Sequence, residues 1–427
     1  MKRAITNAII FTVNEQDRII KNGTVIIDGE KITAVGSSEE VKIPEDTDEI
    51  IDCKGEMALL PGLIDTHNHS SLMRGVVENQ RMVDWLPVYD LEHRACMEED
   101  AYHAARLCYL ECLKNGTTTI MDMYRFMDRC AEAAGELGIP YYVMNFKREF
   151  KEQVMDYFIG EYRLGRTPNP CIACNRYVKW EALLHRCLGI GADYIATGHY
   201  GNIKKLPNGR FAVTKSASLN KDQSYVLYNL TQEELSHTLF PISTMEKDEV
   251  RKIAERAGLP VAHKKDSQDI CFIKDGDYAS FIEEQTGVKS GPGDFVDSKG
   301  NVLGRHAGII HYTVGQRKGL GIAFGEPRYV IRLDVPKNQV VLGTLDELMT
   351  KEVLFDDINY MSVSDINEPV KVTGKVRYSA KDVPCTLYPA KDGIMKAVFE
   401  EPVRAATPGQ AAVFYKDGCI VCGGSII

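Results

Sequence analysis

The sequence has 427 residues, of which 44% are hydrophobic and 26% are charged, so the chain can form two or three domains with cores of their own. It holds no run of about 18 apolar residues, which excludes a membrane-spanning helix. The short apolar stretch at the N-terminus breaks at Asn14 and is interpreted as a strand, not a signal peptide. Twelve cysteines are too few for a disulfide scaffold at this length, so we expect reduced thiols in a cytoplasm.

The net charge of −9 is unevenly distributed along the chain. Residues 1–140 carry 14 basic and 25 acidic side chains, whereas residues 141–427 carry 37 and 35. The contrast indicates two pieces of different origin. The near-neutral second piece neither requires nor excludes a nucleic-acid partner, because a local basic patch is enough for binding.

The first elements are predicted to be strands. Residues 4–60 read as short strands with a hairpin turn at Asp28-Gly29. An apolar strand at 58–64 then runs into a His-x-His pattern. Side chains two apart on a strand face the same side, so His67 and His69 can both face one metal ion.

A helix at 97–114, a strand in "NGTTTIMDMY" and a helix closed by Gly138 follow. The ordered pair "PGLIDTHNH" and "NGTTTIMDMY" resembles the amidohydrolase superfamily over about residues 1–140, most closely its deaminases and chlorohydrolases. That resemblance implies a metal at His67 and His69, at the mouth of a (β/α)₈ barrel. The further His, Glu and Asp that such a site needs do not appear downstream, so we expect the two histidines to be vestigial.

A second region with a different pattern of predicted elements begins at residue 139. A strand "IPYYVMNF" and a helix at 147–165 lead to a Pro-rich loop that carries Cys171 and Cys174. A helix, a strand ending in a Gly-His loop and two further helices follow. From Gly291 onward, short β-rich runs alternate with turns and predict a closed or nearly closed β-barrel.

Seven stretches of this second region stand in the order found in the tRNA-uridine 2-sulfurtransferases, or 2-thiouridylases, which residues 139–427 resemble. They are "GRTPNPCIACN", "GADYIATGHY", "NKDQSYVLY", "LPVAHKKDSQDICF", "YTVGQRKGLGI", "KVRYSA" and "TPGQAAVFY". The resemblance implies that ATP, with Mg²⁺, adenylates O2 of the wobble uridine of a tRNA. Sulfur from a donor, such as a cysteine desulfurase relay or sulfide, then displaces AMP at C2.

The resemblance also assigns the cysteines. Cys174 matches the nucleophile and Cys271 the persulfide-bearing residue, while Cys171 stands where many members have Asp. Members with this Cys-x-x-Cys and the distant Cys are thought to hold a [4Fe–4S] cluster on three thiolates. Persulfide and cluster therefore remain alternatives. Zinc shared with a second pair, Cys419 and Cys422, is a further reading, although that pair reads as a strand whose positions three apart face opposite sides.

The remaining assignments concern ATP and tRNA. Gly198 would let the backbone approach the nucleotide, and basic and aromatic side chains would clamp phosphates or stack on a base. The residues that the resemblance places against tRNA are Asn169, Pro170, Cys171, His199, Lys221, Asp222, Gln223, Arg377, Tyr378 and Gln410.

One family motif is missing. Family members begin with a Ser-Gly-Gly-x-Asp-Ser loop that holds the pyrophosphate of ATP, yet the only Gly-Gly in this sequence is Gly423-Gly424. We therefore expect a chimeric chain: an amidohydrolase-like β-sandwich and barrel start at 1–139, an incomplete PP-loop ATPase-type α/β domain at 140–290, and a β-barrel at 291–427. The expected function is tRNA 2-thiolation with impaired use of ATP; a metal-dependent nucleoside deaminase and a non-catalytic tRNA-binding remnant are the alternatives.

Overall fold

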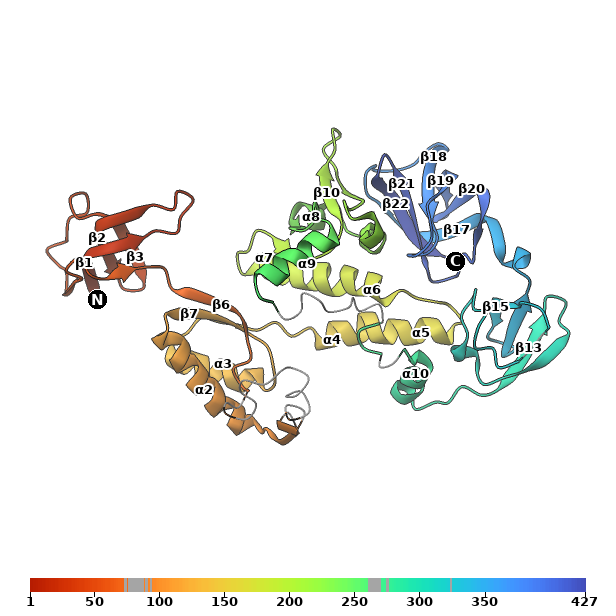
Figure 1. The fold of residues 1–427 in the computed structure, drawn as a ribbon, viewed down its shortest axis with the longest axis horizontal. Coiled ribbons are helices and arrows are strands. Elements are labelled where there is room, and N and C mark those ends of the chain that lie inside the picture. Colours follow the sequence, from red (N-terminus) through yellow and green to blue (C-terminus); the bar gives the residue numbers. More distant parts are fainter. Residues whose placement is uncertain are drawn as a thin grey trace. The chain divides into compact units, whose positions relative to one another are not determined.

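The computed structural model describes residues 1–72, 75, 88, 91–92, 94–259, 270–273, 276–322 and 325–427. The chain divides into two compact units, Met1–Met144 and Asn145–Ile427 (Figure 1). Within the described ranges, no helix has the length and apolar character needed to cross a membrane.

The first unit opens with a sheet of order β3-β2-β1-β4, in which β5 also pairs with β1. Alternate residues of β1 point inward, among them Ala8 and Ile10, as expected for a sheet with one buried face. The predicted hairpin is confirmed: β2 and β3 are joined at Gly29, which has a φ of +61°. The strands are β1 (Lys2–Phe11), β2 (Ile19–Asp28), β3 (Lys31–Ser37), β4 (Glu49–Asp52) and β5 (Ala58–Leu59).

A parallel sheet of order β6-β7-β8 forms the rest of this unit. Its strands are β6 (Leu63–Asn68), β7 (Thr117–Asp122) and β8 (Tyr141–Tyr142), linked through α2 (Glu98–Lys114) and α3 (Met127–Leu137). Gly138 ends α3 in the left-handed conformation, as predicted. The strand predicted at "IPYYVMNF" is only two residues long.

Two long helical runs lie side by side in the second unit (Figure 1). The first joins α4 (Lys147–Phe150), η1 (Lys151–Asp156) and α5 (Tyr157–Arg163); the second joins α6 (Pro170–Ala173), η2 (Cys174–Leu184) and α7 (His185–Gly189). Both η1 and η2 are π-helical. The shorter helices are η3 (Leu219–Lys221), η4 (Ser224–Leu227), α8 (Gln232–Ser236), α9 (Lys247–Arg256) and α10 (Tyr278–Thr286).

The parallel sheet of this unit is small. Only β9 (Ile195–Ala196) and β12 (Thr238–Leu239) pair in it. Parallel strands are usually covered on both faces, yet Leu239 is 48% exposed and the neighbouring Tyr194 is 54% exposed. A separate hairpin of β10 (Asn202–Lys205) and β11 (Phe211–Thr214) joins the C-terminal strands through β22.

The C-terminal β-rich region differs from the single barrel predicted over 291–427. Its first part is a sheet of order β14-β13-β16-β15, and only the last part closes into a ring, β17-β20-β19-β18-β21-β22, in which β22 pairs back with β17. Local sequence gives each strand but not its partner, so the two sheets could not be separated beforehand. Their elements are β13 (Gly293–Asp297), β14 (Val302–His306), η5 (Ile309–His311), β15 (Tyr329–Asp334), β16 (Gln339–Gly343), η6 (Asp346–Leu348), β17 (Met349–Tyr360), β18 (Val370–Lys375), β19 (Val383–Lys391), β20 (Ile394–Arg404), β21 (Ala411–Lys416) and β22 (Cys419–Ile426).

Shared cores fix these parts to one another. Trp180 of η2 is fully buried in a cluster with Leu227 and with Ile420 of the barrel. Phe158 of α5 is buried with Phe295 and other residues of the four-stranded sheet. Apolar packing therefore holds η2 against the barrel and α5 against the four-stranded sheet. This packing defines the position of the loop that connects the two helical runs.

Candidate active site

Cys171 and Cys174 lie on the first turns of a helix, and not in the loop that was predicted. Asn169 caps this helix: its Oδ1 accepts hydrogen bonds from the backbone N–H groups of Cys171 (3.1 Å) and Ile172 (3.4 Å). Pro170 occupies the first helical position, where its missing N–H costs nothing. The signal for a helix start was therefore in the sequence. Residues three apart share one face of a helix, so the two thiols lie on the same side.

Cys271 acts electrostatically on this pair, although it is 97 residues from Cys174 in the sequence. Its charge is one of the causes that raise the pKa of Cys171 and of Cys174. Aromatic packing anchors Cys271, because the next residue, Phe272, contacts Phe158 and Phe150 with ring centroids 5.6 and 5.7 Å apart. The prediction that the three thiols act together stays a prediction. Most of the motif before Cys271, including Asp269, lies outside the described residues.

The environment of the pair raises the pKa of both thiols. Burial is the first cause that raises the pKa of both Cys171 and Cys174, and Lys179 partly opposes it. Sequence reasoning missed Lys179. It stands five residues after Cys174 in a π-helix, where i and i+5 are hydrogen-bonding neighbours. Its Nζ also donates to Asn175 Oδ1 at 3.0 Å.

The Gly-His loop after β9 supplies the next group. A Cβ at Gly198 would meet no heavy atom within 4 Å, so the fold itself does not require glycine there, and a ligand can approach this backbone. His199 packs against Trp180 at a ring distance of 5.6 Å and contacts the Thr197 hydroxyl through Nδ1 at 2.8 Å. Burial lowers the pKa of His199 to about 4, so its imidazole is neutral at pH 7 and can offer a hydrogen bond but not a charge.

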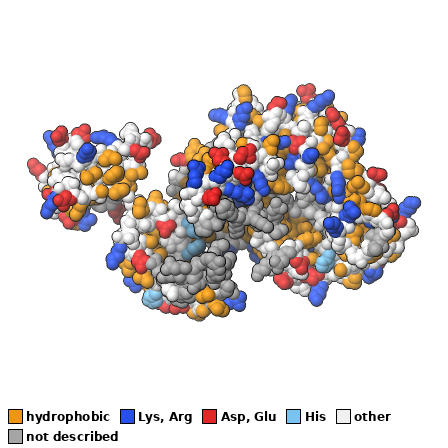
Figure 2. Space-filling view, in the orientation of Figure 1, with side chains coloured by type: hydrophobic (Ala, Val, Ile, Leu, Met, Phe, Trp, Pro, Cys, Tyr) orange, Lys and Arg blue, Asp and Glu red, His pale blue; other side chains and the backbone are white. Residues whose placement is uncertain are grey.

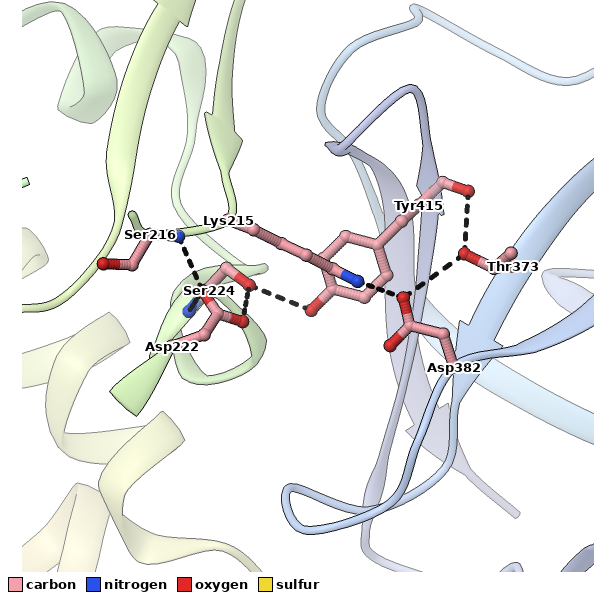
Figure 3. Close-up of polar contacts among 7 residues, drawn as sticks. All are labelled: Lys215, Ser216, Asp222, Ser224, Thr373, Asp382 and Tyr415. Carbon is pink, nitrogen blue, oxygen red and sulfur yellow. Dashed lines mark hydrogen bonds and ion pairs between the residues drawn. The ribbon is translucent and has the colours of Figure 1, made fainter. Parts of the chain in front are cut away.

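The Lys-Asp-Gln sequence turns two of its three side chains inward. The carboxylate of Asp222 accepts hydrogen bonds from Ser216 N–H (3.0 Å), Ser224 N–H (3.3 Å) and Ser224 Oγ–H (2.7 Å) (Figure 3). Gln223 Oε1 accepts from the backbone N–H of Tyr200 at 2.9 Å, and Gln223 N–H donates to Tyr200 O at 2.7 Å. These residues therefore join the Gly-His loop to the loop after β11.

The two residues expected from "KVRYSA" have different environments. The Arg377 guanidinium donates to Val314 O (2.7 Å), Ala405 O (3.0 Å) and Thr407 Oγ1 (2.7 Å), so it clamps the four-stranded sheet region to the barrel. Tyr378 is 44% exposed. The charges of Asp222, Lys221 and Cys171 all affect the pKa of Tyr378, which burial raises. The charge of Cys171 thus acts on Tyr378, and a site shared by Tyr378 and the thiols stays a prediction.

Gln410 acts on the loop before the cysteine helix. Its Nε2 donates to Thr167 O at 2.8 Å, and Thr167 N–H donates to Pro408 O at 2.8 Å. Between them, Gly409 approaches so closely that a Cβ would lie 3.1 Å from Thr167 N. The barrel thereby sets where Asn169 begins its helix, a coupling that no local pattern could reveal.

His67 and His69 face the same side in the first unit, as predicted, with ring centroids 4.9 Å apart. The Nδ1 of His69 lies 2.6 Å from Met123 O and is therefore the N–H donor. Across the described ranges, no three His, Cys, Asp or Glu side chains are placed to hold a metal ion. This applies to the histidine pair and to the three cysteines alike, so as placed the thiols do not form a cluster site.

Surface charge does not by itself mark a nucleic-acid face. Figure 2 shows basic and acidic side chains interspersed over the visible face of the second unit. Among the residues that the structure describes, the charges of Lys179 and Lys221 act on Cys171 and Tyr378, respectively. Any affinity for tRNA must come from such local groups.

Comparison with known families covers most of the chain. Three family models match in order: a tRNA methyl transferase HUP domain over residues 95–275, a tRNA methyl transferase PRC-barrel domain over 279–344, and an aminomethyltransferase β-barrel domain over 350–427. The last two divide the β-rich region where the structure divides it. The first begins at residue 95, within the part that resembled an amidohydrolase.

Curated relatives decide the family. A tRNA-specific 2-thiouridylase MnmA from Lachnoclostridium phytofermentans is 57% identical over 301 residues, which is 70% of this chain and 84% of the relative. Its counterpart from Clostridioides difficile is 50% identical over 295 residues, 69% of this chain and 81% of that protein. The chain belongs to the MnmA family of tRNA-specific 2-thiouridylases. Its α/β part is a HUP domain, and the C-terminal part is a closed β-barrel.

Solved structures give much weaker likenesses. A triazine hydrolase variant is 26% identical over 33% of this chain and 34% of its own, with a TM-score of 0.29. An adenosine deaminase from Xanthomonas campestris with bound zinc is 22% identical over 33% of each chain, with a TM-score of 0.31. Scores this low carry no argument, so the amidohydrolase origin of the first region stays a prediction.

Proposed function

We propose that this protein transfers sulfur to C2 of the wobble uridine in tRNA, with ATP as the activating co-substrate. The observation that carries the proposal is the 57% identity of the chain to a named tRNA-specific 2-thiouridylase. The charge effects of Cys271 on Cys174 and of Cys171 on Tyr378 support it. The HUP match supports ATP as the nucleotide.

The residues support a persulfide route. The terminal sulfur of a Cys271 persulfide attacks C2 of the adenylated uridine, AMP leaves with the former O2, and a C2–S–S–Cys271 linkage forms. The Cys174 thiolate then attacks the Cys271 sulfur, which releases the thiocarbonyl and leaves a Cys174–Cys271 disulfide. An external thiol returns two electrons to that disulfide. Because burial raises the pKa of Cys174, this attack needs deprotonation in the complex, and Lys179 is the local cation that favours it.

ATP binding is the step for which this sequence lacks a family motif. Open space in front of Gly198 suits a nucleotide, but the 427 residues hold no Ser-Gly-Gly-x-Asp-Ser loop for its phosphates. We therefore expect weak ATP binding and slow activation of the uridine. We also propose that the first region has an amidohydrolase-type origin and that the chain is chimeric, which the two motifs and the uneven charge support.

The test is the yield of 2-thiouridine in tRNA after incubation with the protein, Mg-ATP, an external thiol and a cysteine desulfurase with cysteine, which supplies the sulfane sulfur of the Cys271 persulfide. Mass spectrometry of the digested nucleosides measures the yield. We expect slow formation that rises with ATP through the millimolar range and disappears in Cys174→Ser. Binding of tRNA without any thiolation at all ATP concentrations would leave only a tRNA-binding remnant. Stoichiometric iron and sulfide in anaerobically purified protein, lost in Cys171→Ser, would replace the persulfide route by the cluster.

A metal-dependent nucleoside deaminase is the second candidate, favoured only by the shared side of His67 and His69. Incubation of adenosine with the zinc-supplemented protein tests it. We expect no inosine, because two histidines without a third ligand hold zinc poorly.

A further inference from the structure

A continuous polar network joins the loop that carries Asp222 to the C-terminal barrel (Figure 3). The Ser224 hydroxyl donates to the Asp222 carboxylate at 2.7 Å and lies 3.2 Å from the Tyr415 hydroxyl. A carboxylate only accepts hydrogen bonds, so the direction of the chain is fixed. The Tyr415 O–H donates to Ser224, and Ser224 donates to Asp222.

Tyr415 stands at the centre of a second set of contacts, on the barrel side. Lys215 forms an ion pair with Asp382, and its Nζ lies 4.8 Å from the centre of the Tyr415 ring. Thr373 Oγ1 lies 3.5 Å from both Asp382 Oδ2 and Tyr415 O. Tyr415 is only 2% exposed, so it cannot reach RNA and acts through its neighbours.

Separating the partners of this network would cost free energy, because its charged groups would lose their opposite charges. The charges of Asp382, Asp222 and Lys215 also act on the half-buried Lys375, whose Nζ lies 6.0 Å from the centre of the Tyr225 ring. Removing one partner from such a set leaves another unpaired away from water. The segment 215–224 is therefore held from the barrel side, and Gln223 holds its other end through Tyr200.

We propose that Tyr415 and Asp222 are positioning residues for tRNA binding: through Ser224 they fix the segment that carries Lys221. Asp222 is thereby an internal anchor of the Lys-Asp-Gln sequence and not itself a contact with RNA. This inference rests on the proposed tRNA substrate.

A double-mutant cycle on tRNA binding tests the inference. Tyr415→Phe removes one hydroxyl and keeps the ring. We expect it to weaken tRNA binding about 3- to 10-fold, as for the loss of one hydrogen bond, and to lower the slope of log K against log salt by up to about 1, as Lys221→Ala does. In a Lys221→Ala background Tyr415→Phe should have no further effect. Additive effects would overturn the proposal.

Two further variants distinguish a positioning role of Asp222 from a direct contact between Asp222 and RNA, and from a general effect on folding. Asp222→Asn should show the same coupling to Tyr415→Phe, whereas a direct contact between Asp222 and RNA would make their effects multiply. Tyr388→Phe is the matched control, since Lys396 Nζ lies 5.3 Å from that ring, elsewhere on the barrel; it should leave binding unchanged. If the unsubstituted protein binds no tRNA, the proposed function fails. Hydrogen exchange still tests the network then, because Tyr415→Phe should speed exchange in 215–224, and unchanged exchange there would refute it.

Discussion

Each of the two units carries a pair of closely spaced residues of a type that binds metals, but the two pairs have different surroundings. His67 and His69 are paired by strand spacing, and Cys171 and Cys174 by helix spacing. The charge of Cys271, whose neighbour Phe272 packs on Phe158, acts on the cysteine pair, although these three thiols as placed are not arranged to hold a metal ion either. Across the described ranges, no third ligand joins the histidines. We expect a local pair to become a functional site only when a distant segment supplies a third group. Substitutions in the pairs and in the contacts that hold them test this expectation.

The largest expected effect is on chemistry at the cysteines. Cys174→Ser and Cys271→Ser should each lower the yield of 2-thiouridine by about 10³-fold or more, because the hydroxyl cannot replace sulfur as nucleophile or carrier. Cys187→Ser, on α7 of the same helical run, is the matched control and should keep activity. Single-turnover thiolation with equal tRNA occupancy measures the difference. Activity retained in Cys271→Ser would mean that the meeting of the three thiols is incidental.

Sequence predicted the cysteines but not what holds them. The hairpin at Gly29, the end of α3 at Gly138 and the helical runs follow from local rules, as does the pairing of His67 and His69 on one side. Tertiary contacts decided the rest. The strand at Tyr141 is short because strand length depends on its neighbour, and Arg377 acts as an internal clamp because Val314 and Thr407 lie within its reach.

The next effect tests the barrel's hold on the cysteine helix. Gly409 and Gly418 both have positive φ, at +86° and +76°. A Cβ at Gly409 would lie 3.1 Å from Thr167 N, whereas a Cβ at Gly418 meets nothing within 4 Å. Gly418→Ala should lower the free energy of unfolding by about 1–2 kcal/mol from backbone strain alone. Gly409→Ala should lower it by about 2–4 kcal/mol, because the clash adds to strain.

Urea denaturation measures both variants, and thiolation relative to the folded fraction measures the site. We expect Gly409→Ala to lose activity beyond its loss of folded protein, since Thr167 and the cap at Asn169 must shift. Equal behaviour of the two glycine variants would show that the barrel does not place the cysteine helix.

A smaller effect concerns pH. The pKa of His199 is lowered to about 4, mainly by burial, whereas an unfolded histidine titrates near pH 6.5. Between these values the unfolded chain binds more protons, so His199 makes the protein less stable as pH falls from about 6.5 to 4. The full shift corresponds to at most about 3 kcal/mol, and less because the ring keeps some solvent contact. His199→Gln should flatten this part of the urea-midpoint profile, and exposed His185→Gln should not.

The smallest expected effect lies in the first unit, where the histidine pair has no partner ligand among the described residues. Zinc binding, followed by competition with a chromophoric chelator, should be weak and little changed by His67→Gln with His69→Gln, because two imidazoles supply half of a tetrahedral shell. His103→Gln, on α2 of the same unit, controls for adventitious surface binding. Micromolar or tighter zinc binding that is lost only in the His67 and His69 variant would contradict the expectation that the first unit has no complete metal site. It would mean that a third ligand does reach the pair, and that the first unit carries a metal site of its own.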